Sequence, residues 1–90
     1  MKTLPHVHLN GTGPQTLFDG YLKAYEACRD ALEVIQAIEF NARDYYPLSY
    51  STWPEACAEM REYVKNIAAA RDAFLAVACH VQEVSGDKLK

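Results

Sequence analysis

Two helix-start motifs of the same form constrain the fold of this chain more than any other feature. The motif reads Thr-x-Pro followed by Gln or Glu, and it begins at Thr12 and again at Thr52. In each copy the threonine hydroxyl can cap a free backbone N–H, and proline in the first turn costs no hydrogen bond. Long segments without proline follow both motifs, so we predict helices over residues 13–39 and 53–84.

Apolar residues recur at alternating spacings of three and four in both predicted helices, which places them on one side of each helix. These two stripes are Leu17, Tyr21, Ala24, Cys28, Ala31, Ile35 and Ile38, and Met60, Tyr63, Ile67, Ala70, Phe74, Val77, Val81 and Val84. A connector over residues 40–52 is long enough to reverse the chain, so we predict an all-α fold, a long antiparallel helical hairpin. Gly20 costs about 1 kcal/mol against alanine inside a helix, and it marks either a close helix–helix approach or a tolerated position near the helix end.

A second apolar set lies beside the two stripes. Its members are Phe18, Leu22, Tyr25, Leu32, Val34, Cys57, Val64, Ala68, Leu75 and Ala78. One partner helix cannot cover both sets, and an apolar patch of that size is unusual on a monomer. We therefore expect a homo-oligomer, most simply a dimer that forms a four-helix bundle, or a larger ring of hairpins. The alternative is a monomer whose N-terminal arm and connector cover the second face.

The 90 residues fit a single helical domain. We expect an extended N-terminal arm (1–12), the two helices, an aromatic connector (40–52) and a tail (85–90) that begins at a Ser-Gly-Asp helix stop. The sequence has no apolar leader at its start and no run of about 18 apolar residues, so we expect no signal peptide and no membrane contact. Three cysteines without CxxC spacing fit free thiols in a reducing cytoplasm, which is the predicted location.

The charged residues argue against several function classes. Nine basic and twelve acidic residues give a net charge of −3 and no basic face, so we expect no duplex DNA partner. The charges alternate with the apolar stripes as solvated faces do, and no nucleophile elbow or phosphate-binding loop occurs, so we expect no enzyme and no cofactor. His6 and His8 would lie on one side of an extended arm, but Cys79 and His80 point in different directions, so we expect no metal site.

The connector is the strongest candidate site, because it places several aromatic residues beside an arginine. Arginine can hold a phosphate with two hydrogen bonds, and tyrosine rings can stack on bases. In a symmetric oligomer, two connectors, or a connector and a neighbour's arm, would form a pocket suited to a small anionic nucleotide. The predicted ligand-binding residues are Arg43, Asp44, Tyr45, Tyr46 and Tyr50, with Asn10 and Thr12 contributed by a neighbour.

Each part of that site has a structural alternative. Arg43 and Asp44 would then cap the end of the first helix, while the connector's tyrosines and Trp53 close the end of the hairpin core. Asn10 and Thr12 belong to a glycine-flanked helix start that offers free N–H groups to an anion, or they form a plain cap.

Two short motifs carry a resemblance over about half of the chain. The sequence His8-Leu9-Asn10-Gly11-Thr12, then a helix, then Arg43-Asp44-Tyr45-Tyr46-Pro47, resembles a group of short uncharacterised proteins of tailed bacteriophages. The group has no known activity, and its members have glycine where this chain has Ala42, which would allow a left-handed turn there.

The resemblance implies a phage context, in which small proteins act by binding to host components. Some proteins of that kind are helical oligomers that sequester cyclic nucleotide signals of bacterial immunity, although the motifs of that class are not found here. We therefore expect a helical binding protein that sequesters or blocks a host component in the host cytoplasm, with a cyclic nucleotide as one ligand. The alternative is a protein–protein interaction module that docks a host or virion protein through its second apolar face.

Overall fold

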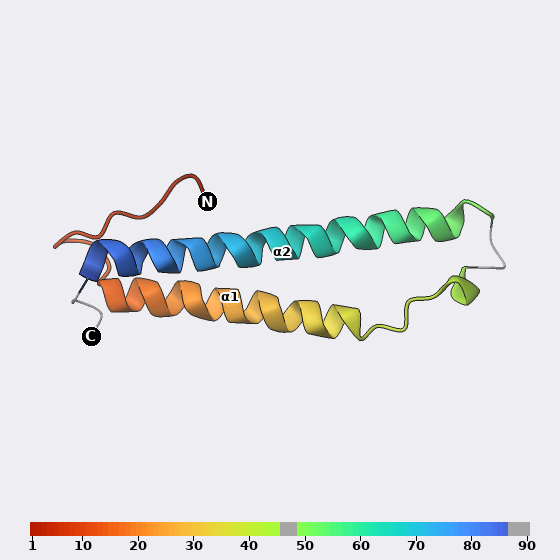
Figure 1. Cartoon of the computed structure of the whole chain (residues 1–90), viewed down its shortest axis with the longest axis horizontal. Coiled ribbons are helices and arrows are strands. Elements are labelled where there is room, and N and C mark those ends of the chain that lie inside the picture. The colour runs from red at the N-terminus through yellow and green to blue at the C-terminus, as the bar shows by residue number, and fades with distance from the viewer. Residues whose placement is uncertain (46–48, 87–90) are drawn as a thin grey trace.

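Two long helices dominate the structure, which is a computed structural model that describes residues 1–45 and 49–86. Helices α1 (Pro14–Gln36) and α2 (Thr52–Ser85) lie side by side and run in opposite directions (Figure 1). The 3-10 helix η1 (Ala42–Asp44) lies between them in sequence, and the described part of the chain contains no strand. The all-helical prediction is confirmed, and the molecule is a rod of 61 × 23 × 17 Å.

The predicted threonine caps are wrong at both helices. The N-cap of α1 is Gly13, whose carbonyl accepts from the Leu17 N–H at 3.0 Å, and no side chain caps this end. Thr12 lies one residue too early to reach the first turn. Gln15 does not reach back either, because its amide donates forward to Asp19 at 2.8 Å.

At α2 the threonine lies one residue too late. The N-cap is Ser51, and Thr52 is already the first helical residue. Its hydroxyl lies 2.8 Å from the Ser49 hydroxyl, so it bonds within the turn and leaves the backbone N–H groups of the helix uncapped by side chains. Because proline fixes the first turn in both motifs, the motif located the helix starts to within a residue despite the wrong cap.

The helix ends follow local backbone hydrogen bonding. Helix α1 ends at Gln36 and not at residue 39. The Ala37 N–H is shared between the Glu33 and Val34 carbonyls, and the Ile38 N–H bonds to the Ile35 carbonyl three residues back, which tightens the last turn. Helix α2 ends where Gly86 adopts φ 52°, with its N–H donating to the Gln82 carbonyl. A side chain is strained at that φ, so glycine stops the helix.

Full burial is concentrated near the C-terminal end of α2. Residues 1–13 contain no helix or strand and run back along this end of α2 (Figure 1), where His80 Nε2 lies 3.2 Å from the Pro5 carbonyl oxygen. Val77 and Val81 are completely buried there, and Tyr21 of α1 lies beside Phe74 with ring centres 6.3 Å apart. The two helices and the N-terminal segment together make this end the core of the single chain.

The two predicted apolar sets do not divide into covered and uncovered residues as expected. Leu32 and Ala78, both assigned to the second face, are buried in the hairpin. Conversely, three residues of the predicted stripes are more than half exposed: Ile38 at 51%, Tyr63 at 61% and Val84 at 53%. Each helix is therefore rotated about its own axis relative to the orientation that the predicted seam implied. Most of the remaining apolar side chains are only half-buried.

Candidate functional site

Three aromatic rings pack together at the connector end of the hairpin. Phe40 lies 4.8 Å from Trp53 and 5.9 Å from Tyr45, and Tyr45 lies 5.5 Å from Trp53, all measured between ring centres. The rings are tilted or edge-on, which are the arrangements that aromatic pairs favour. Residues from three separate parts of the chain thus close this end of the rod, which is the packing role that the sequence left open for Tyr45 and Trp53.

The charged pair of the connector belongs to η1 and not to the end of α1. Arg43 and Asp44 are both exposed, and among the described residues neither takes part in an ion pair. Ala42 starts this turn, and no residue other than glycine has a positive φ in 1–45 or 49–86, so no left-handed turn is needed there. Asn41, which the sequence reasoning did not single out, has a buried side-chain oxygen without a hydrogen-bond partner in the described structure.

The predicted site contains two further tyrosines, Tyr50 and Tyr46, and the structure describes only the first of them. The Tyr50 side chain is fully exposed, with an accessibility of 104% of the reference value. Tyr46 lies outside the described residues. Arg43, Asp44 and Tyr50 are therefore open to solvent, while Tyr45 is occupied by packing.

Asn10 and Thr12 directly precede α1, and the start of α1 lies at the opposite end of the rod from the connector (Figure 1). Both are exposed. A pocket that combined them with Arg43 would therefore require a second copy of the chain, arranged so that the two ends meet.

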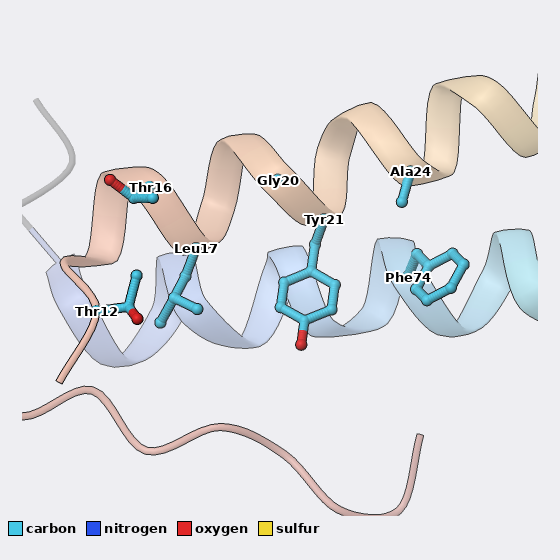
Figure 2. Close-up of a pocket in the computed structure, with 7 residues that line it drawn as sticks. All are labelled: Thr12, Thr16, Leu17, Gly20, Tyr21, Ala24 and Phe74. Atoms are coloured by element: carbon cyan, nitrogen blue, oxygen red, sulfur yellow. The ribbon is translucent and has the colours of Figure 1, made fainter.

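Thr12 instead contributes to an apolar hollow of about 280 Å³ on the N-terminal half of α1. Leu17, Tyr21 and Ala24 reach from α1 toward α2, Phe74 closes the hollow from α2, and Gly20 leaves space on the α1 side (Figure 2). The sequence analysis missed this hollow, although it noted Gly20 as either a close helix–helix approach or a tolerated position near the helix end. Since its lining is almost entirely apolar, the hollow suits an apolar side chain better than a nucleotide phosphate.

Several of the remaining polar and ring groups form local pairs. The rings of His6 and His8 stack at 5.6 Å, as expected for alternate residues of an extended segment. Arg71 Nε donates to Asp72 at 2.9 Å, and that hydrogen bond raises the pKa of Arg71. Within residues 1–45 and 49–86, no three histidine, cysteine, aspartate or glutamate side chains gather closely enough to hold a metal ion.

Comparison with known proteins adds no functional assignment. No protein-family model, no curated protein and no solved structure matches the chain. Across the described residues, neither helix combines the length and the apolar character that crossing a bilayer requires.

Proposed function

We propose that this chain is a helical binding protein that works as a homo-oligomer, in which hairpins pair into a helix bundle. In this proposal the bundle acts by blocking or sequestering a host component in the bacterial cytoplasm, which is the role that the resemblance to small phage proteins implies. Binding through helix faces requires no catalytic group, and it uses the features that distinguish this chain: long helices and incompletely covered apolar side chains.

The observation that carries the proposal is the size of the exposed surface. The chain exposes 6778 Å², whereas a compact monomer of 10.1 kDa exposes about 5,300 Å². The excess of about 1,500 Å² is close to what each partner buries in a large homodimer interface. The radius of gyration agrees, since 18.8 Å greatly exceeds the roughly 12 Å of a compact chain of this length.

Thermal unfolding tests this proposal without a known ligand. If folding and association are coupled, dilution from about 100 µM to about 1 µM lowers the Tm by about 7 °C, because mass action favours separated unfolded chains. Sedimentation equilibrium over the same range should report a mass above 10.1 kDa at the higher concentration. A Tm independent of concentration together with a monomer mass contradicts the proposal, and it favours docking onto a different protein through the same apolar faces.

A second candidate function is supported by the exposure of Arg43, Asp44 and Tyr50. A bundle that brought two connectors together would place two guanidinium groups and two free tyrosine rings near one another, an arrangement suited to a cyclic nucleotide. Asn10 and Thr12 of a neighbour would complete such a site only if a connector met the opposite end of another hairpin.

Calorimetry tests the nucleotide candidate. Wild-type protein is titrated with cyclic and linear mononucleotides and dinucleotides, beside Arg43→Ala and the control Arg61→Ala, which removes an exposed arginine from α2. We expect Arg43→Ala to weaken binding about tenfold or more, since a charged hydrogen bond contributes about 1.5–3 kcal/mol. Absence of heat with every nucleotide removes this candidate and leaves the oligomer proposal unchanged.

A further inference from the structure

One side of α1 carries a long strip without charge, and the hollow of Figure 2 lies at its N-terminal end. The strip residues follow one another at alternating spacings of three and four, the spacing of a helix–helix seam. They are Leu17, Gly20, Ala24, Ala27, Ala31 and Val34, and Ile38 continues the spacing just beyond the helix. This strip borders the hairpin seam. Leu17, Ala24 and Ala31 are half-buried on the side toward α2, whereas Gly20 and Ala27 are exposed and Val34 is 69% exposed, so α2 leaves the outer part of the strip uncovered.

No contact among the described residues requires glycine at position 20. A Cβ added at Gly20 would meet no atom within 4 Å, so alanine would fit there. Glycine in the middle of a helix costs about 1 kcal/mol relative to alanine. An additional helix packed closely against α1 would use the space that glycine leaves.

The strip is uneven in size, and this unevenness favours an antiparallel partner. Leu17 begins the strip, Gly20 and Ala24 follow it beside the hollow, and the strip ends in the bulkier Val34 and Ile38. A parallel pair of copies would set Val34 against Val34 and leave the hollow unfilled. An antiparallel pair with Gly20 of one copy opposite Val34 of the other places each Val34 in the hollow beside Gly20, and it brings Leu17 near Ile38 of the other copy.

The charges beside the strip fit the same arrangement. If Gly20 of one copy faces Val34 of the other, the twofold axis passes at Ala27. Lys23 and Asp30, both exposed, then lie on the same edge of the strip at nearly equal distances on either side of that axis. Within the chain Asp30 has one long, exposed ion pair, with Arg29 Nε at 3.6 Å, which leaves its carboxylate accessible to a second cation. The axis brings Lys23 of each copy opposite Asp30 of the other, giving two symmetric ion pairs.

We propose that a second copy of this chain docks antiparallel on the α1 strip, with Ala27 at the twofold axis, Val34 in the hollow of the other copy and Lys23 paired with Asp30 across the interface. This inference rests on the proposed self-association and specifies its surface. A contact along the full length of α1 would also bury part of the exposed surface that exceeds that of a compact monomer.

A charge-swap series measured by sedimentation equilibrium tests the pairing. Lys23→Glu and Asp30→Lys should each weaken the dimer about tenfold, because each turns two attractive contacts into two repulsive ones. The double variant K23E/D30K should return the dimer dissociation constant to within about threefold of wild type, since the two pairs are restored with reversed sign. Two single variants that weaken the dimer and a double variant that does not recover would overturn the register.

Ala27→Glu tests the surface itself. It places two carboxylates at the axis and should weaken the dimer about a hundredfold or more. Ala76→Glu is the matched control, because Ala76 is an exposed alanine of α2 outside the strip and should leave the dimer unchanged. Circular dichroism checks that both variants keep their helices. If A27E and A76E dimerise equally well, self-association stands but uses another face, whereas a wild-type monomer overturns both proposals.

Discussion

Replacing Val81 with aspartate is expected to cause the largest loss of stability of any single substitution considered for this chain. Val81 is completely buried, and it lies near the C-terminal end of α2. An unpaired carboxylate at such a position costs about 3–5 kcal/mol, and a chain of 90 residues has only about 5–13 kcal/mol of total stability. We expect chemical denaturation to show a loss of about 4 kcal/mol, and a Tm lower by about 20 °C.

Val84→Asp is the control for that substitution. Val84 lies in the last turn of the same helix and is 53% exposed, so the same change of side chain there should cost no more than about 1 kcal/mol. Equal losses for the two variants would show that the C-terminal part of α2 is not the core of the chain. The comparison therefore tests the location of the core separately from the helical propensity of aspartate.

Trp53→Ala is expected to produce the second largest loss of stability. The half-buried Trp53 ring contacts both Phe40 and Tyr45, so its removal opens a gap between the start of α2 and the segment that follows α1. Truncating an aromatic that is only partly buried costs about 2 kcal/mol, which corresponds to a Tm lower by about 10 °C. Differential scanning calorimetry at a fixed protein concentration measures this shift.

Tyr50→Ala separates packing from binding in the same connector. Because Tyr50 is fully exposed, its removal should change the Tm by less than about 2 °C, which is the range of an ordinary surface substitution. A Tm fall for Tyr50→Ala as large as for Trp53→Ala would mean that the connector packs differently from the arrangement described. An unchanged Tm combined with lost nucleotide heat would assign Tyr50 to a binding role.

The helical class and the helix positions were predictable because they depend on local chemistry. Proline has a fixed φ that suits a first helical turn, and glycine adopts a positive φ that ends a helix. Because both effects are local to the residue, Pro14 and Gly86 indicate the helix ends without knowledge of the tertiary structure. The threonine caps were predicted wrongly because a shift of one residue, at Thr12 and again at Thr52, removes the hydroxyl from the N–H groups that it would cap. Sequence patterns do not resolve that difference.

The candidate site was less predictable, since the same residue types serve packing and binding. Tyr45 and Tyr50 are both connector tyrosines, yet one lies in an aromatic cluster and the other lies in solvent. Only the path of the backbone between α1 and α2 decides which ring faces Trp53. The hollow at Gly20 was missed for a similar reason, because its far wall is Phe74, distant in sequence.

By itself the sequence determined that this protein forms two long helices, and that their apolar side chains outnumber those that one helix–helix contact can cover. Both follow from periodicity and backbone preferences, which are properties of each segment alone. The tertiary structure decided which apolar side chains are covered. The rotation of α1 and α2 about their axes buries Leu32 and Ala78 and leaves Val34 and Tyr63 outside. That rotation depends on how side chains of different size interlock between the helices, which a repeating pattern of apolar positions does not specify.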